Sequence, residues 1–217
     1  MARQRGAGMA EHRTLSSLFP AIAPAVQDEA GVTCRALPVE GPLLLVPTGR
    51  TARSASSHAA CMALVNAGIA VSEYFMRGSR TEHYDRHVVS GLHCQLPPQA
   101  QGRLLQCGQG VAWVVVVAVR TGSPSFGQWA GVALSAENAC QLWIPPGFLH
   151  GLCSLADHTE VLHRQTRPDM AACARTIRWN DETLGIEWPV SDHQAIPAAP
   201  DGHAPPFANV IDWFFYT

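Results

Sequence analysis

The chain has 217 residues, of which 47% are hydrophobic and 15% are charged, and its formal net charge is −2. This length and apolar content suit one globular domain with its own core, and the absence of a run of like charges argues against nucleic acid or a membrane surface as a main partner. All fifteen basic residues are arginine. Lysine-based carbonyl chemistry, through a Schiff base or pyridoxal phosphate, is therefore excluded.

The two ends of the chain differ in composition from its middle. Residues 1–31 contain early arginines, and prolines at 20 and 24 interrupt their apolar part, so we expect a flexible leader instead of a signal peptide. A segment rich in proline and alanine at 195–206 precedes the apolar tail VIDWFFY at 210–216. We therefore expect a domain at residues 32–192 and a C-terminal segment at 193–217 whose tail docks on the domain or on a partner subunit.

The middle of the chain contains one helical signal and many short strand signals. Residues 61–70 (CMALVNAGIA) have helical composition. Strands are expected at 88–95, 104–107, 111–120, 128–134, 140–144, 150–155 and 159–166, separated by clusters of Gly, Pro, Ser and Asn. That spacing is typical of an all-β sandwich or jelly roll with a few short helices.

The strand at 111–120, VAWVVVVAVR, is apolar on both of its faces. It needs cover from a second sheet on one face and from a helix or another subunit on the other, and a homodimer is the simplest source of that cover. Its apolar part is far shorter than the roughly 20 residues of a membrane helix, so no transmembrane span is expected. The seven cysteines are odd in number and form no C-x-x-C pair, which favours reduced thiols and a cytoplasmic protein.

The segment PGFLHG at 146–151 is a turn that delivers a histidine to the next strand. Proline pre-sets φ and glycine tolerates positive φ, so the turn aims His150 at a defined point. Together with GLHCQ at 91–95, WND at 179–181 and LGIEWP at 184–189, the stretch resembles the dTDP-4-dehydrorhamnose 3,5-epimerase family of sugar-nucleotide enzymes over roughly residues 88–190. The resemblance implies a cupin-type double-stranded β-helix, a small-molecule substrate, a homodimer and no cofactor.

Epimerisation beside a carbonyl needs a base, a group that stabilises the enolate oxygen and an acid on the opposite face. His93 matches the base of the family's G-L-H-x-Q motif, and strand alternation sets Gln95, a substrate-binding residue by this resemblance, on the same face. The resemblance places the aspartate that orients the base at Asp201, with Asp192 as the alternative. His150 would bind the substrate and the developing oxyanion.

At two further positions the family's catalytic or binding residue is replaced by a residue of another type that could serve the same purpose. Arg103 stands where the family has a lysine that holds the enolate; it keeps the charge and is a poorer proton donor, and we assign it to substrate binding. His163 stands where the family has its tyrosine acid, and an imidazole can deliver a proton near neutral pH. It faces the barrel interior if Val161, on the same strand face, does so too.

Other family residues are absent. Ser90 replaces an arginine that binds the nucleotide phosphate, Val114 and Ala118 replace aspartates, and Ala174 replaces a glutamate. Arg77, Arg80 and Arg86 are the arginines that could compensate.

Three hypotheses remain open. The first is an epimerase of a dTDP-4-keto-6-deoxy sugar with His93, Asp201 and His163 as its catalytic residues. The second is a cupin of natural-product biosynthesis that isomerises or cyclises a non-nucleotide substrate, and the third is a non-catalytic binding subunit. A metal site would require His93, His150 and His163 to converge, because the H-x-H pair of metal-binding cupins is absent, and we expect none.

Overall fold

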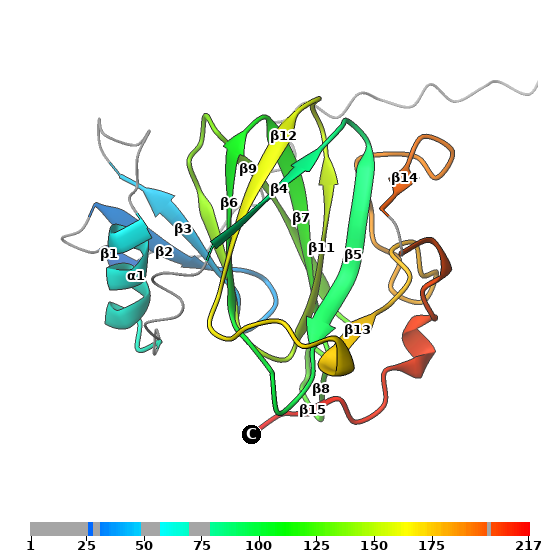
Figure 1. Cartoon of the computed structure of the whole chain (residues 1–217). Helices are drawn as coiled ribbons and strands as arrows, with labels where there is room; N and C mark the ends of the chain where they lie inside the picture. The colour runs from blue at the N-terminus through cyan, green and yellow to red at the C-terminus, as the bar shows by residue number, and fades with distance from the viewer. Residues whose placement is uncertain (1–25, 28–30, 49–56, 70–78, 199–200) are drawn as a thin grey trace, which may run out of the picture.

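The structure is a computed structural model that describes residues 26–27, 31–48, 57–69, 79–198 and 201–217. Within these residues two sheets face each other (Figure 1). Sheet A has seven strands in the order β1 (Val26–Gln27), β2 (Val32–Ala36), β3 (Leu43–Pro47), β10 (Gln141–Ile144), β6 (Arg103–Gln109), β12 (Thr159–Gln165) and β4 (Ser79–Tyr84). Sheet B runs β13 (Ala174–Thr176), β5 (Val88–Gln95), β11 (Phe148–Ser154), β7 (Val111–Ala118) and β9 (Trp129–Ser135), with β14 (Ile196–Pro197) beside β5.

The smaller elements lie outside these two sheets. Strands β8 (Arg120–Thr121) and β15 (Phe214–Phe215) pair in parallel. The helix α1 covers Ser57–Asn66, and three short 3-10 helices are η3 (Ala171–Cys173), η4 (Asp201–His203) and η5 (Phe207–Asn209). The prediction of an all-β, cupin-type architecture with a few short helices is confirmed.

The expected strands from residue 88 onward are all present, with ends shifted by one or two residues, except that 111–120 stops at Ala118 and a separate short strand follows. The helix begins and ends four residues earlier than expected, because Gly68 adopts a left-handed φ of 81° and Ile69 donates its N–H back to Leu64. A glycine in this conformation closes a helix at its C-terminus. The strands at 32–36, 43–47 and 79–84 were not predicted.

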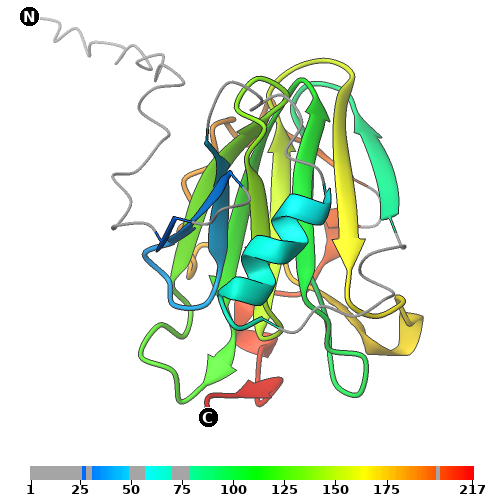
Figure 2. The same cartoon turned by 90° about the vertical axis from the view of Figure 1, so that its left-hand side faces the viewer.

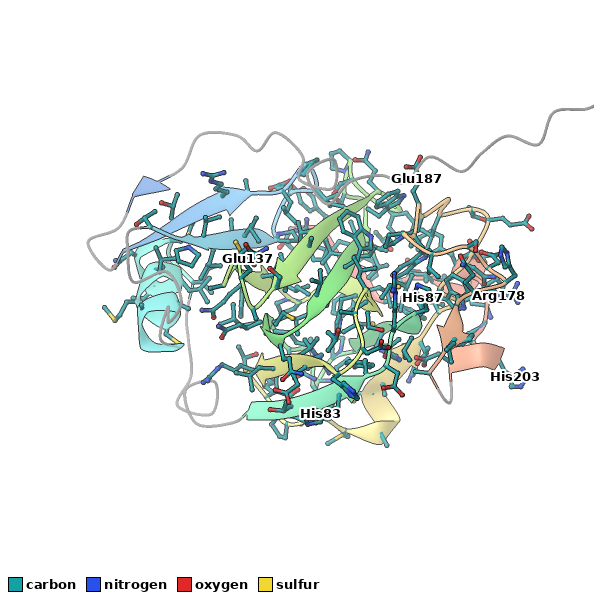
Figure 3. The ribbon with its side chains drawn as sticks, turned by 90° about the horizontal axis from the view of Figure 1, so that it is seen from above. His83, His87, Glu137, Arg178, Glu187 and His203 are labelled. Carbon is teal, nitrogen blue, oxygen red and sulfur yellow. The ribbon has the colours of Figure 1, made fainter. Side chains whose placement is uncertain are left out.

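The main core lies between the two sheets. Sheet A contributes Leu105, Leu142 and Val161, and sheet B contributes Val114, Val116 and Leu152, all at most 3% exposed. Side chains fill the space between the ribbons (Figure 3). Because Val161 belongs to this core, His163 two residues later on β12 also faces the interior.

The outer faces of both sheets are covered by other parts of this chain. On sheet A, α1 lies over the outer face (Figure 2). Ala60 and Leu64 of the helix pack there in one cluster with Leu45 and Trp143. On sheet B, Val115 and Val117 of β7 pack in one cluster with C-terminal residues, among them Ile177, Trp179, Leu184, Phe207 and Val210. The double-faced strand therefore needs no second subunit for its cover, and the homodimer stays a prediction.

Two tryptophans and a buried aspartate organise the C-terminal cover. Asp181 accepts hydrogen bonds from the backbone N–H groups of Thr183, Leu184 and Phe207. The indole N–H of Trp188 donates to the carbonyl of Trp179. The W-N-D and W-P motifs thus fix the path that carries the chain back to β5.

That path ends beside the histidine strand. Ile196–Pro197 pairs in parallel with Val88 and Val89 of β5, and the Ala198 N–H donates to the carbonyl of Val89 at 2.8 Å. Asp201 follows three residues later. At the other end of the chain, β1 falls inside the segment expected to be a flexible leader, and residues 1–25 lie outside the described residues. No helix in the described part is long and apolar enough to span a membrane.

Candidate active site

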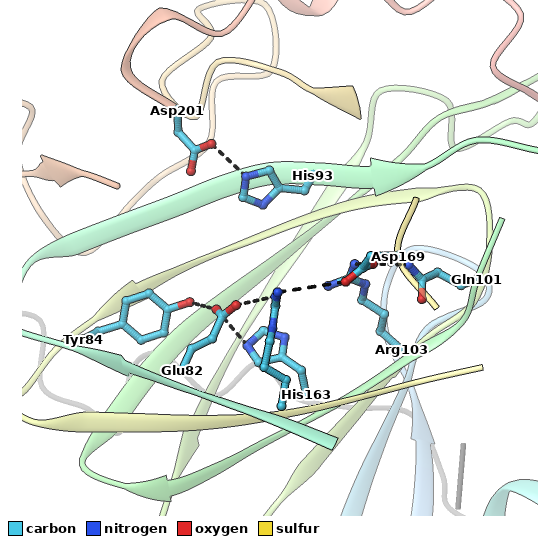
Figure 4. Close-up of polar contacts among 9 residues, drawn as sticks. Glu82, Tyr84, His93, Gln101, Arg103, His163, Asp169 and Asp201 are labelled. Carbon is cyan, nitrogen blue, oxygen red and sulfur yellow. Dashed lines mark hydrogen bonds and ion pairs between the residues drawn. The ribbon is translucent and has the colours of Figure 1, made fainter. Parts of the chain in front are cut away.

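His93 and Asp201 form a hydrogen-bonded pair at the inner side of β5. Nε2 of His93 lies 2.8 Å from Oδ1 of Asp201, whose side chain is only 2% exposed (Figure 4). His203, two residues farther along η4, extends away from the body of the protein (Figure 3). Asp192, the alternative partner in the sequence analysis, is exposed, so Asp201 is the aspartate that the fold brings to His93.

A glycine in β5 makes this pairing sterically possible. Gly91 has a φ of 118°, and a Cβ at that position would lie 2.6 Å from Cα of Gly151 on β11. Only glycine allows so close an approach at such a φ. The Gly91 N–H then donates to Oδ2 of Asp201 at 2.9 Å, so both carboxylate oxygens are engaged and the aspartate has a fixed orientation.

A hollow of about 320 Å³, part of it open to solvent, lies beside this pair. Its lining includes the predicted site residues His93, Arg103, His150 and His163, together with Ser90. The His93 side chain is 34% exposed. The histidine is therefore accessible to a small molecule while its aspartate is not.

His150 lies directly across the strand pair from His93. The two residues are cross-strand neighbours on β5 and β11, and their ring centroids are 6.4 Å apart. Burial, reinforced by the positive charge of Arg103 and by His93 and His163, holds the pKa of His150 well below its usual value. His150 is therefore a neutral imidazole that can donate or accept a hydrogen bond without adding charge.

Arg103 is buried and is held by a carboxylate at the rim. Its Nη2 lies 2.9 Å from Oδ1 of Asp169, and the amide of Gln101 donates to the same oxygen at 2.7 Å. Burial opposes ionisation of Asp169, but Arg103 and these hydrogen bonds outweigh it and lower the pKa of the carboxyl. Arg103 thus supplies a fixed cation to the hollow.

Gln95 lies two residues after His93 on β5, at the edge of the site. Its Oε1 accepts a hydrogen bond from the Met170 N–H at 3.3 Å. It lines a second, adjoining hollow of about 260 Å³ that shares Arg103 and His150 with the first. Five of the six predicted site residues thus line the two adjoining hollows, and the sixth, Asp201, lies behind His93. Gln95 does not line the hollow that His93 lines.

His163 on β12 lies beside a carboxylate from the neighbouring strand. Its Nε2 is 3.3 Å from Oε2 of Glu82 on β4, and the ring is 5% exposed. Glu82 also accepts a hydrogen bond from the hydroxyl of Tyr84 (Figure 4), and it forms an ion pair with Arg80. Burial disfavours the charged form of Glu82, but His163, Tyr84 and Arg80 together lower its pKa to about 2, so it is ionised at neutral pH.

Two of the three arginines considered as replacements for the missing phosphate ligand lie among the described residues. Arg80 lines the hollow beside Ser90. Arg86 is exposed in the loop before β5, and Arg77 lies outside the described residues. Among the described residues, no group of three or more His, Cys, Asp or Glu side chains is arranged to hold a metal ion.

Comparison with known proteins identifies the family. A family model described as dTDP-4-dehydrorhamnose 3,5-epimerase matches residues 57–209. The chain belongs to the dTDP-4-dehydrorhamnose 3,5-epimerase family.

Curated members of this epimerase family align with about half of the chain. The dTDP-4-dehydrorhamnose 3,5-epimerase of Salmonella typhimurium is 46% identical over 120 residues, which are 55% of this chain and 65% of that protein. That of Pseudomonas aeruginosa is 47% identical over 107 residues, 49% of this chain and 59% of that protein. The chain therefore spans less than two thirds of the length of these relatives.

Solved structures of the epimerase family share the fold over more of the chain. The 3,5-epimerase from Legionella pneumophila, in complex with dTDP-4-keto-L-rhamnose, has a TM-score of 0.76 at 27% identity and covers 86% of this chain and 99% of its own. A 3′-monoepimerase from Streptomyces bikiniensis in complex with dTDP-quinovose has a TM-score of 0.57 at 28% identity, over 60% of this chain and 66% of its own.

Sequence reasoning missed the contribution of β4 to the site of this epimerase-family member. Arg80, Glu82 and Tyr84 line the hollow, whereas Thr81 and His83 between them are exposed. This alternation is the signature of a half-buried strand. It could have revealed β4, but the strand has no aliphatic residue to mark its inner face.

Proposed function

We propose that the protein is an epimerase that moves a proton beside the carbonyl of a dTDP-4-keto-6-deoxy sugar. The observation that carries this proposal is the His93–Asp201 pair at a hollow that His150, Arg103 and His163 also line. Membership of the epimerase family supports it. Two relatives of similar fold are described in complex with dTDP-linked sugars, which supports a nucleotide sugar as substrate here.

His93 acts as the base. When Nε2–H donates to Asp201, the lone pair of Nδ1 is left to take the proton from the carbon next to the carbonyl. The ring becomes an imidazolium, and the carboxylate 2.8 Å away stabilises it. Because Asp201 accepts a second hydrogen bond from Gly91, it is fixed in place before the substrate arrives.

The enolate oxygen formed in this step needs positive partners. The buried guanidinium of Arg103 and the neutral ring of His150 line both hollows, and we assign them to the carbonyl oxygen, with Gln95 binding the substrate in the adjoining hollow. His163 stands on the opposite sheet from His93. It returns a proton to the other face of the carbon, which inverts the configuration.

Solvent deuterium exchange tests the reaction. The purified protein, incubated in D₂O with dTDP-4-keto-6-deoxyglucose, should introduce deuterium at C3, at C5 or at both, as measured by mass spectrometry and NMR. His93→Ala should slow this exchange by about 100-fold or more, whereas His203→Ala, at an exposed histidine, should leave it unchanged. Exchange that persists in His93→Ala would remove the base from this proposal.

Binding of the nucleotide is tested separately by thermal unfolding. At a concentration 100 times its Kd, dTDP should stabilise the fold by about 2.7 kcal/mol, which corresponds to about 5–10 °C for a chain of this length. No shift would favour a non-nucleotide substrate, in line with Ser90 in place of the phosphate-binding arginine. A shift without any exchange would favour a non-catalytic binding protein.

We also propose that the protein is cytoplasmic and homodimeric. All seven cysteines are free thiols in the structure, as expected in a reducing compartment. Light scattering after size-exclusion chromatography measures the assembly, and a mass near 23.3 kDa, that of one chain, would contradict the dimer.

A further inference from the structure

Two histidine–carboxylate pairs face the same hollow from opposite sheets. On sheet B, Asp201 holds His93, and on sheet A, Glu82 lies 3.3 Å from His163. Figure 4 shows Asp201 reaching His93 from one side, with Glu82 and His163 on the other. The resemblance to the family accounts for the first pair and says nothing of the second.

The strand register fixes the second pair. Glu82 is the cross-strand partner of Val161 in the antiparallel ladder of β4 and β12. His163 lies two residues beyond Val161 and therefore on the same face, diagonal to Glu82. Any change that kept the barrel core around Val161 would keep Glu82 and His163 side by side.

Glu82 is maintained as a carboxylate by its own neighbours. The hydroxyl of Tyr84 donates to it, and the guanidinium of Arg80 pairs with it, both from alternate positions of the same strand. Arg103 from β6 and His150 from β11 line the hollow as well, as does His93 from β5. Glu82 is the one carboxylate among the residues described as lining this hollow, whose fixed cations are Arg80 and Arg103.

Neither ring nitrogen of His163 makes a hydrogen bond among the described residues, and both are buried. Nε2 lies at ion-pair distance from Glu82, 3.3 Å from Oε2, whereas Nδ1 has neither a hydrogen bond nor an ion pair there. A buried polar atom without a partner is costly, and in a native site it often marks a place that a ligand or a reaction completes. With Nε2 directed at Glu82, Nδ1 is the nitrogen left for the substrate.

We propose that Glu82 is a positioning residue that orients His163 through Nε2 and acts as counter-ion while Nδ1 donates a proton, so that His163 replaces the tyrosine acid of the family. This inference rests on the proposed function. His93 takes the proton from carbon as the C–H bond breaks, and the electron pair moves into the enolate. A new C–H bond then forms with the proton from Nδ1 of His163, and the enolate electrons return to the carbonyl.

The cycle closes without an added reactant. After one turnover His93 carries the proton that it removed, and His163 is neutral beside a carboxylate. Solvent restores His93, which is one-third exposed, and reaches the buried His163 through the partly open hollow once the product has left. Because the two histidines act on opposite faces, proton removal and inversion are separate steps that can be measured separately.

Glu82→Gln is the deciding variant. It removes the charge of the Glu82 side chain and keeps its shape. His93 should therefore still catalyse incorporation of solvent deuterium into the substrate, with at most a small loss of rate. Formation of the epimerised product, followed by NMR, should fall by about 10- to 100-fold, less than the roughly 100- to 10,000-fold that a general acid supplies in full, because His163 itself remains. Glu82→Asp, which restores the carboxylate, should recover part of that loss.

The pH profile separates this role from a structural one. The pH profile of epimer formation should differ between wild type and Glu82→Gln, because the variant removes the carboxylate that lies 3.3 Å from the ring of the acid. A merely structural role would lower the rate at every pH and leave the profile in place. Unfolding temperatures of all variants are measured in parallel. If Glu82→Gln unfolds at a temperature far below that of wild type, the pH profile of Glu82→Asp is compared with that of wild type instead.

The chain offers a matched control on the same two strands. Glu160 of β12 lies 3.4 Å from Nδ1 of His83 on β4; the His83 side chain is 67% exposed and that of Glu160 is 38% exposed. Glu160→Gln removes a histidine–carboxylate pair of the same type outside the hollow. It should leave exchange, epimer formation and the pH profile unchanged.

Three outcomes would overturn the inference. One is epimer formation in Glu82→Gln at the wild-type rate and with the wild-type pH profile. Another is a loss of exchange equal to the loss of epimer, because Glu82 would then support the whole site. A third is Tyr84→Phe abolishing epimer formation while Glu82→Gln retains it, since the phenol would then be the acid. If the proposed function itself is wrong, the result is different: the wild-type protein shows no deuterium exchange.

Discussion

Asp201→Asn is the most direct test of the His93–Asp201 pair, because it removes a charge with almost no change in side-chain volume. Asp201 is 2% exposed and lies 2.8 Å from Nε2 of His93. Without the carboxylate, the imidazolium that forms during proton abstraction loses its counter-ion. An amide can also direct its NH₂ group at Nε2 and thereby stabilise the wrong tautomer of the ring.

The size of the effect follows from the geometry. Two unit charges about 4 Å apart attract each other by about 4 kcal/mol at an effective dielectric constant of about 20. Because His93 is 34% exposed, solvent screening reduces this by up to about half. The barrier should therefore rise by about 2–4 kcal/mol, which lowers kcat by about 30- to 1,000-fold.

The assay is deuterium incorporation at saturating substrate, with Asp192→Asn as the control at an exposed aspartate. KM should change little, since Asp201 lines neither of the two hollows. The unfolding temperature should fall modestly, because the hydrogen bond from the Gly91 N–H to Asp201 is altered. A folded Asp201→Asn protein with kcat within about threefold of wild type would refute the reasoning, because it would mean that the pair contributes less than about 0.7 kcal/mol.

Three further predictions concern the fold that supports the site. Gly91→Ala should destabilise the protein by more than about 2 kcal/mol, because the new Cβ meets Gly151 at 2.6 Å; chemical denaturation measures this, and Gly122→Ala, where φ is also positive but space is open, should cost less. Trp188→Phe should lower the unfolding temperature by about 1–6 °C, since it removes a hydrogen bond worth about 0.5–1.5 kcal/mol, and an unchanged melting curve would contradict the structural role of the W-P motif. The pKa of Glu82 is lowered to about 2 from 4.5, so its stabilising contribution is present above about pH 4.5 and is lost as the pH falls toward 2; wild type should therefore lose more stability than Glu82→Gln over that range in acid denaturation curves, and parallel curves would argue against the ionised carboxylate.

The sequence by itself determined the elements that depend on local pattern. Alternation, turn residues and an apolar run predicted the strands from residue 88 onward, and the motif at 91–95 together with the turn before His150 indicated two histidines of one site. These features can be predicted from sequence because the alternation of a strand, the residues of a turn and the residues of a short motif all lie within a few neighbouring positions. Strand β4, which has little aliphatic character, left no such trace.

Only the tertiary structure decided which distant residues meet. Asp201 is 108 positions from His93, and the sequence allowed either Asp201 or Asp192 as the partner of the histidine. The parallel pairing of β14 with β5 brings Asp201 to His93. Glu82 reaches His163 through the register of β4 on β12, and the outer face of β7 is covered by the chain's own C-terminal residues. Pairing register and the return path of a chain are set by long-range packing, and no local pattern encodes them.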